Sequence, residues 1–197
     1  ARKFHLRNGA KELQVNRTSQ NFEYTIEDSK WEKVSTPFGD PSDKIFTGKL
    51  NQIEIAFLPR HGRGHVHSPS SVPYMANICA LKMLGVTDII ALSACGSLRD
   101  DFKPGEFILI DQFIDRTFKR EKTFFSRGCV AHVSVAKPVC NRLSLISKTA
   151  MDHLNIKHHL GGTYLTMEGP QFSTRAESLL YKESWKCDVI GMTNMPE

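Results

Sequence analysis

Short apolar runs recur along the chain and have the length of buried strands. They are IEIAFLP from Ile53, TDIIALSA from Thr87, EFILIDQFI from Glu106, TYLTMEG from Thr163 and CDVIGMT from Cys187. Runs of this length, rich in β-branched residues and followed by polar turns, are typical of strands in a buried sheet. The pattern therefore predicts a strand at each of these five places.

Between some of the runs, apolar residues recur at helical spacing. Residues 72–85 and 142–155 show this pattern, and Thr174 and Glu177 have the spacing of a capping box at a third helix start. The expected faces are Met75, Ile78 and Leu81, or Ala76, Cys79 and Met83, in the first helix, and Leu143, Ile146, Ala150 and Leu154 in the second. Strands that alternate with helices predict α/β layers, in which ligands gather at strand ends.

Composition narrows the class of protein. The chain has 197 residues, 40% of them hydrophobic and 24% charged, which predicts one globular domain spanning residues 1–197. No apolar run reaches the ~18 residues that span a bilayer.

The formal net charge is +5, and residues 1–20 hold five basic residues against one acidic residue. The charge therefore describes a basic N-terminal segment and argues against a nucleic-acid groove. The five cysteines are odd in number and form no Cys-x-x-Cys pair, which favours free thiols in a reducing compartment.

The string RHGRGHVH, residues 60–67, follows the predicted strand at Ile53. Arginine forks match phosphate geometry, and glycines let backbone N–H groups approach an anion. Two other interpretations stay open: a basic surface loop, and a metal site through His61, His65 and His67, for which no neighbouring carboxylate or cysteine completes the ligands.

The string SACGS, residues 93–97, is a turn of small residues at the end of the run from Thr87. Its N–H groups, together with the hydroxyls of Ser93 and Ser97, predict an anion nest. Cys95 is a candidate nucleophile, but a small buried thiol is the favoured interpretation because the sequence identifies no partner histidine.

Two strings close the predicted strands of the C-terminal part. In MEGPQFS, residues 167–173, Phe172 either stacks on a flat ligand or fills the core, and Glu168 is placed to bind a sugar hydroxyl. In GMTNMPE, residues 191–197, Thr193 is a candidate phosphate donor and Met192 a candidate ligand contact.

Taken together and in this order, PRHGRGH, SACGSLRDD, DQFIDRT, MEGPQFSTRAES and IGMTNMPE resemble the 5′-methylthioadenosine phosphorylases, of the trimeric purine nucleoside phosphorylase group. The resemblance runs from about Thr36 to Glu197. It implies a central mixed sheet flanked by helices, incomplete relative to the family, and the phosphorolysis of methylthioadenosine to adenine and 5-methylthioribose 1-phosphate.

The resemblance also implies the site residues. The phosphate would be bound by Arg60, His61, Ser93, Ala94, Thr193 and, in the divergent N-terminal stretch LQVNRTSQN, by Thr18. The nucleoside would be bound by Cys95, Gly96, Phe172, Gly191, Met192, His65 and His132. The family's purine-recognising aspartates follow the MTNMPE string, so the catalytic acid is not assigned among these residues, and we expect little turnover by the 197 residues alone.

The resemblance implies inorganic phosphate as co-substrate, no cofactor and no metal. It further implies a homotrimer in the cytoplasm, with the nucleus as a second location, and no nucleic-acid or membrane partner. The alternative function is a relative that binds nucleoside or phosphate without turnover. A third is a nucleoside hydrolase that uses water in place of phosphate.

Overall fold

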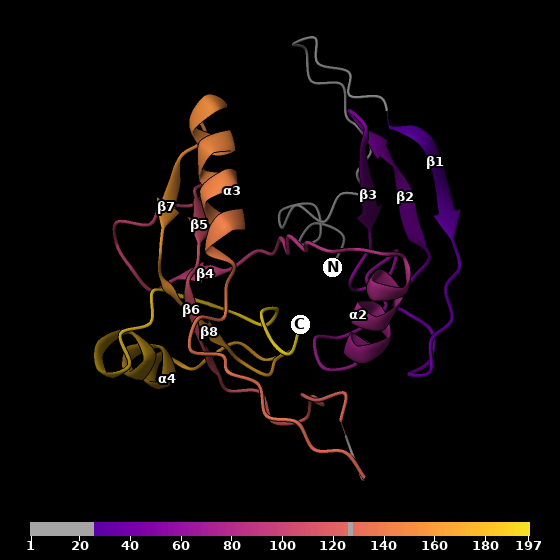
Figure 1. Ribbon diagram of the computed structural model, residues 1–197. Helices are drawn as coiled ribbons and strands as arrows, with labels where there is room; N and C mark the ends of the chain where they lie inside the picture. Colours follow the sequence, from indigo (N-terminus) through magenta and orange to yellow (C-terminus); the bar gives the residue numbers. More distant parts are fainter. Residues whose placement is uncertain (1–25, 126–127) are drawn as a thin grey trace. The chain divides into compact units, whose positions relative to one another are not determined.

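The computed structural model describes residues 26–125 and 128–197. These residues form two compact units, one that ends at Ile89 and one that starts at Ile90 (Figure 1). The basic segment 1–20 and Thr18 lie outside the described residues. The single-domain organisation expected from the chain length stays a prediction.

The first unit contains an antiparallel sheet with one helix packed on it. Its strands β1 (Glu27–Glu32), β2 (Ile45–Leu50) and β3 (Ile53–Phe57) pair in sequence order. β2 and β3 are joined by a two-residue hairpin in which Asn51 and Gln52 both have positive φ, a backbone conformation that matches the twist of the strands. Helix α2 (Tyr74–Met83) contributes Ala80 and Leu81 to a cluster around the fully buried Ile45.

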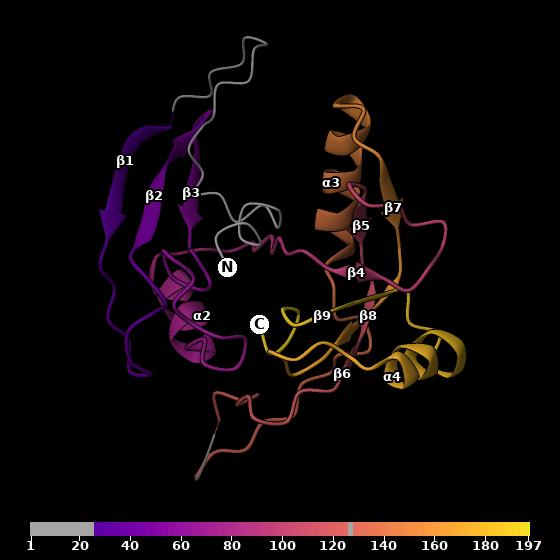
Figure 2. The same cartoon turned by 180° about the vertical axis from the view of Figure 1, so that it is seen from behind.

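The second unit contains two small sheets. A four-stranded sheet has the order β4 (Gly96–Ser97), β9 (Val189–Gly191), β8 (Thr163–Thr166) and β6 (Gln112–Asp115), seen in Figure 2. β6, β8 and β9 run parallel, whereas β4 pairs antiparallel with β9, so the sheet is mixed as the resemblance implies. The second sheet pairs β5 (Phe107–Leu109) in parallel with β7 (His158–Leu160).

The helices of this unit are α3 (Asn141–His153), which lies beside β7, and α4 (Arg175–Leu179), which continues into the π-helical segment η1 (Leu180–Ser184) (Figure 1). The predicted capping box at α4 is confirmed: Thr174 accepts from the Glu177 N–H, and the Glu177 carboxylate accepts from the Thr174 N–H. The core of the unit forms around Leu165, Tyr181, Cys187 and Ile190, and around Phe102, Tyr164 and Val189.

The prediction of a strand that begins at Thr87 is wrong. Residues 87–95 form no strand, and Ile90 and Leu92 are 65% and 80% exposed. A strand needs a neighbour that completes its hydrogen bonds. Within residues 87–97, all of which the structure describes, only Gly96 and Ser97 have a neighbouring strand, which is β9.

The run from Glu106 forms two strands instead of one. β5 pairs with β7 and β6 pairs with β8, in different sheets. The extended backbone is interrupted between the two strands, at Asp111. The Asp111 carboxylate accepts a hydrogen bond from the Gly162 N–H at 3.0 Å, and the Asp111 N–H donates to the Gly162 carbonyl at 3.2 Å.

The predicted helix faces are confirmed only in part. Ala76 and Leu81 of α2 are buried, but Met83 is 58% exposed. In α3 no residue is buried, and Ile146 remains exposed on the side that was expected to pack.

All five cysteines lie in the described residues and are free thiols, which is the state that the sequence favours. Among residues 26–125 and 128–197, no helix combines the length and apolarity needed to cross a bilayer.

Candidate active site

In the first unit, Arg60 lies in the loop after β3, and two neighbouring side chains orient its guanidinium group. One guanidinium nitrogen lies 2.8 Å from Nε2 of His61, and the other donates to the hydroxyl of Tyr74 at 3.1 Å. Tyr74 in turn donates to the Pro69 carbonyl. Arg60 is thus half-buried and oriented, which is the state expected of an arginine that binds a planar or tetrahedral anion.

The partners of His61 define its protonation. Its Nδ1 lies 2.8 Å from the His67 carbonyl oxygen, which can only accept, so Nδ1 carries the proton. Its Nε2 faces the Arg60 guanidinium, which can only donate, so Nε2 carries the lone pair. Burial lowers the pKa of His61 to about 4, and the charge of Arg60 acts in the same direction. His61 is therefore neutral at pH 7, and its Nε2 accepts a hydrogen bond that orients the Arg60 guanidinium.

His65 and His67 complete the loop but do not form a metal site with His61. The rings of His61 and His65 stack with centroids 4.1 Å apart. Within the described residues there is no group of three or more histidine, cysteine, aspartate or glutamate side chains that could hold a metal ion. Arg63 anchors the loop, since its backbone N–H, Nε and Nη2 all donate to the Asp43 carboxylate at 2.8–2.9 Å.

In the second unit, the sheet topology brings the candidate residues to one edge. β6, β8 and β9 are parallel, so the residues after Asp115, Thr166 and Gly191 leave the sheet on the same side. β4 is antiparallel to β9, so the residues just before Gly96 lie at that side too. The strings SACGS, MEGPQFS and GMTNMPE thus meet at the carboxyl edge, where open α/β sheets bind ligands.

The centre of this edge is a residue that the sequence analysis treated only as part of a strand, Tyr164. Its side chain is buried and its hydroxyl accepts a long hydrogen bond, 3.4 Å, from the Thr193 N–H. Burial raises the pKa of Tyr164, while polar contacts from Thr193 and from the Ser93 side chain act in the opposite direction. Two predicted phosphate donors, Ser93 and Thr193, therefore share one neutral phenol.

The cysteine of the SACGS turn does not behave as an activated nucleophile. Desolvation raises the pKa of the Cys95 thiol, although part of the residue is exposed, so the thiolate is disfavoured at pH 7. Cys95 is exposed, so the small buried thiol that the sequence favoured is wrong. Ala94 and Gly96 flank it and are exposed as well.

The turn of MEGPQFS packs on the last string. Gly169 has φ +69°, and a β-carbon there would lie 3.1 Å from Cγ of Met192. Phe172, further along the same turn, is 65% exposed, so the core interpretation of this ring is wrong. The Glu168 carboxylate accepts from the N–H groups of Phe118 and Lys119 at 2.6 and 3.3 Å, which ties the loop after β6 to this turn.

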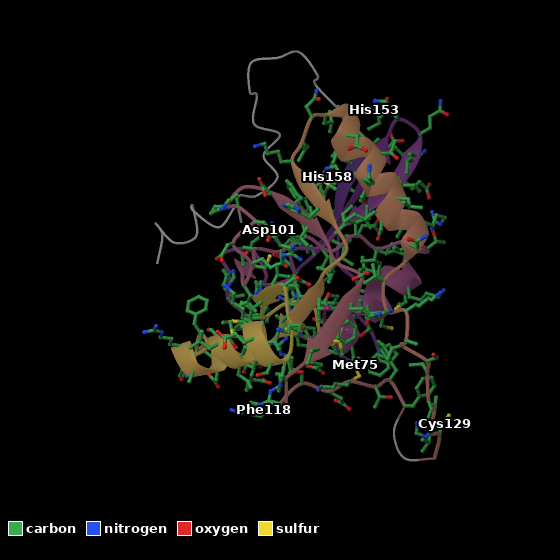
Figure 3. The ribbon with its side chains drawn as sticks, turned by 90° about the vertical axis from the view of Figure 1, so that its left-hand side faces the viewer. Met75, Asp101, Phe118, Cys129, His153 and His158 are labelled. Atoms are coloured by element: carbon green, nitrogen blue, oxygen red, sulfur yellow. The ribbon has the colours of Figure 1, made fainter. Side chains whose placement is uncertain are left out.

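The loop after β6 supplies another residue of the edge, Arg120, which the sequence analysis did not single out. In Figure 3, Phe118 marks this loop, and Cys129 marks the following segment, which carries His132. His132 is exposed, and no hydrogen bond joins it to the other candidate residues of the described chain. The sequence signal for the loop was the DQFIDRT string, whose role only the contacts reveal.

Comparison with known proteins places these observations in a family. A profile of the Phosphorylase superfamily matches residues 17–197. The chain is 64% identical over 172 residues to S-methyl-5′-thioadenosine phosphorylase of Cereibacter sphaeroides, covering 87% of this chain and 59% of the relative. It is 59% identical over 172 residues to the enzyme of that name from Rhodospirillum rubrum, covering 87% and 58%. The chain therefore spans somewhat under two thirds of the length of these curated relatives.

Solved structures agree. A methylthioadenosine phosphorylase from an Antarctic soil metagenomic library matches with a TM-score of 0.85 and 50% identity, over 87% of this chain and 61% of that one. Methylthioadenosine phosphorylase from Schistosoma mansoni, solved in complex with adenine, matches with a TM-score of 0.82 and 37% identity, over 91% and 71%. With its α/β fold and motifs in register, the chain belongs to the Phosphorylase superfamily, as its resemblance to the methylthioadenosine phosphorylases predicted.

Proposed function

We propose that the protein carrying this chain catalyses the phosphorolysis of 5′-methylthioadenosine. Inorganic phosphate attacks the anomeric carbon, the bond from that carbon to the purine nitrogen breaks, and adenine leaves with a proton. The products are adenine and 5-methylthioribose 1-phosphate. The observation that carries the proposal is the meeting of Ser93 and Thr193 at the Tyr164 hydroxyl, in a chain 64% identical to an S-methyl-5′-thioadenosine phosphorylase.

The chemistry explains why these residue types suit the task. As the bond to the purine breaks, the sugar gains oxocarbenium character, so an anion held against one face stabilises it. In the first unit Arg60 offers a permanent positive charge, oriented by His61. In the second unit the Ser93 hydroxyl, the Thr193 hydroxyl and the backbone around Ala94 offer donors that carry no charge of their own. We assign phosphate binding to these groups and to Thr18.

The nucleoside is assigned to less polar groups. Cys95, Gly96, Gly191, Met192 and Phe172 occupy the carboxyl edge of the second unit, and His132 lies in the same unit. His65 belongs to the first unit. The exposed ring of Phe172 offers a flat apolar surface for a purine or a sugar. The neutral thiol of Cys95 and the thioether of Met192 are soft groups that pack well against a methylthio substituent.

The proposal includes the setting of the reaction. Phosphate is the co-substrate, and the reaction needs neither an organic cofactor nor a metal. The protein is proposed to act as a homotrimer in purine and methionine salvage, in the cytoplasm and secondarily in the nucleus. Sedimentation at micromolar concentration tests the trimer, and a stable monomer would contradict it.

The reaction is tested by following adenine release from methylthioadenosine with and without inorganic phosphate. Phosphate-dependent release supports phosphorolysis, phosphate-independent release would indicate a hydrolase, and binding without release would indicate a non-catalytic relative. Arg60→Ala should raise the KM for phosphate about 10-fold or more, because a charge-assisted contact is lost, and should change the KM for the nucleoside far less.

Arg63→Ala is the matched control for that measurement. Arg63 lies in the same loop and also carries a positive charge, but its guanidinium is bound to Asp43. If phosphate affinity falls equally in both variants, general charge or loop stability explains the effect, and the assignment of Arg60 is wrong.

A further inference from the structure

The guanidinium of Arg120 connects two loops at the carboxyl edge of the second unit. Nη1 donates to the carbonyl oxygens of Met192 and Met195 at 2.7 and 2.6 Å. Nη2 donates to those of Glu168 and Met167 at 2.8 and 3.4 Å. Arg120 itself is only 5% exposed. One planar group therefore bonds the backbone after β8 and the backbone after β9 at the same time.

This arrangement depends on the identity of the side chain. A guanidinium carries five N–H donors in a fixed fork, remains charged at every pH a protein tolerates, and accepts nothing. Placing such a charge in a buried position is unfavourable unless several acceptors surround it. The four carbonyl oxygens supply that surrounding, and the rigid fork fixes the spacing between the two loops. A lysine offers three donors from a single atom and cannot reproduce this geometry.

The loop that delivers Arg120 is itself held at several points. The Glu168 carboxylate accepts from the N–H groups of Phe118 and Lys119. Lys122 Nζ lies 2.5 Å from the Asp115 carboxylate and donates to the Thr117 carbonyl at 2.7 Å. Although burial of Asp115 favours its neutral acid, hydrogen bonds from Lys122 and Thr117 hold its pKa below the usual value. The carboxylate therefore stays charged at neutral pH and keeps its contacts with Lys122 and Thr117.

The segments that Arg120 joins carry predicted ligand residues. Met192 is one of its acceptors and is followed at once by Thr193, whose N–H reaches Tyr164. On the other side, Glu168 precedes Gly169, the turn that packs on Met192. Movement of either loop would displace a phosphate donor and a nucleoside contact together.

We propose that Arg120 is a positioning residue: it sets the distance between the Met167–Gly169 turn and the Met192–Met195 segment, and so holds Thr193 and Met192 in place for phosphate and nucleoside. The inference rests on the proposed function. We assign Arg120 no contact with either ligand; it acts through the backbone carbonyls that it binds.

Two variants and a control test it. Arg120→Met removes the donors and keeps much of the stem, whereas Arg120→Lys keeps the charge and loses the fork. The control is Arg99→Met. Arg99 binds Asp101 and Asp188, and Asp188 immediately precedes β9, so Arg99 secures the opposite end of the same strand. Thermal unfolding of all three variants reports the structural loss that any such change causes.

The first measurement is amide hydrogen exchange over residues 192–195, which needs no activity. Exchange there should speed up about 10-fold or more in Arg120→Lys and Arg120→Met, and stay within twofold of wild type in Arg99→Met. Unchanged exchange in Arg120→Lys overturns the proposal. If Arg120→Met does not fold, Arg120→Lys alone decides.

The second measurement is binding of inorganic phosphate by calorimetry, together with the KM values for phosphate and methylthioadenosine. Both Arg120 variants should weaken both ligands, about 5-fold or more, while Arg99→Met of comparable thermal stability changes neither beyond twofold. Equal weakening in Arg99→Met overturns a specific positioning role. If the wild type neither binds phosphate nor releases adenine, the proposed function fails, and the exchange measurement still decides whether Arg120 fixes the segment.

Discussion

The ring of Tyr164 occupies the space that a side chain on Gly191 would need. A β-carbon on Gly191 would overlap the Tyr164 hydroxyl and lie 2.7 Å from Cζ. Tyr164 pairs with Val189 across the two strands, so its side chain extends two residues along β9 to reach Gly191 and the Thr193 N–H. Gly191 is therefore required by its neighbour, since its own φ is not in the positive region.

This contact predicts that Gly191→Ala destabilises the protein by about 1–3 kcal/mol, the usual cost of overpacking a buried site. Tyr164→Leu in the same chain should recover part of that loss by making room. Chemical denaturation of the two single variants and the double variant measures the coupling. Additive effects would show that the two residues do not compete for space.

The polar role of the same tyrosine predicts a second effect. Tyr164→Phe keeps the ring and removes the hydroxyl near Ser93 and Thr193, so phosphate affinity should fall about 2- to 10-fold, the value of one neutral hydrogen bond. Calorimetry with inorganic phosphate measures it. Tyr181→Phe is the control, because Tyr181 is equally buried but belongs to the cluster around Leu165 and Cys187. A similar fall in both variants would remove the special role of Tyr164.

A buried hydroxyl at the end of β8 predicts a stabilising substitution. Thr166 is fully buried, and its Oγ1 has no hydrogen-bond partner among the described residues. Thr166→Val replaces that hydroxyl by a methyl group of the same shape, which should raise the free energy of unfolding by about 0.5–1.5 kcal/mol. A loss of stability instead would reveal a partner, such as a bound water, for this oxygen.

The environment of His61 predicts a pH dependence. Its pKa is lowered from 6.5 to about 4 in the folded chain, so between those values the unfolded chain binds more protons than the folded one. The contribution of His61 to the free energy of unfolding is fully present above about pH 6.5 and is lost as the pH falls toward 4. Urea unfolding at several pH values should show this slope.

The control for the pH measurement is His61→Gln, which removes the titrating ring and keeps a polar side chain beside Arg60. The slope between about pH 6.5 and 4 should become shallower. The carboxylates of Asp43 and Asp115 have lowered pKa values, so their contribution is lost mainly below about pH 5, and the slope between about pH 6.5 and 5 reports on His61. An unchanged slope would mean that His61 is accessible to protons in the folded chain.

The sequence predicts elements best where local chemistry decides them. The capping box at Thr174 needs only two side chains and the intervening backbone, and β3, β8 and β9 lie within predicted runs. β1 was not predicted, because its residues EDSKWE are charged and almost all exposed, so no alternation marks a buried face. The run at Thr87 shows the opposite error: apolar character indicates a preference for burial, but cannot identify the strand that would pair with it.

The sequence motifs that form the site could be predicted, but the contacts between their residues could not. Glycine, serine and threonine at strand ends indicated Ser93 and Thr193, because anion-binding turns have a recognisable composition. Tyr164 was not singled out because β8 is buried from Tyr164 to Thr166, so its pattern does not distinguish the two faces. Arg120 bonds to residues 47–75 positions further along the chain, and nothing local marks such a partner.

The position of β9 inside its sheet has a consequence for synthesis of the protein. β9 pairs with β4 on one side and β8 on the other, although it is the last of the four strands along the chain. While a ribosome makes the chain, β4, β6 and β8 emerge first, and β4 has no partner until residues 189–191 follow. The strand pairings of β4 span more than 90 residues, which is a slow, non-local step. Until then, β4 and β8 each lack the partner that β9 supplies, so unpaired backbone groups on these edges are open to other chains.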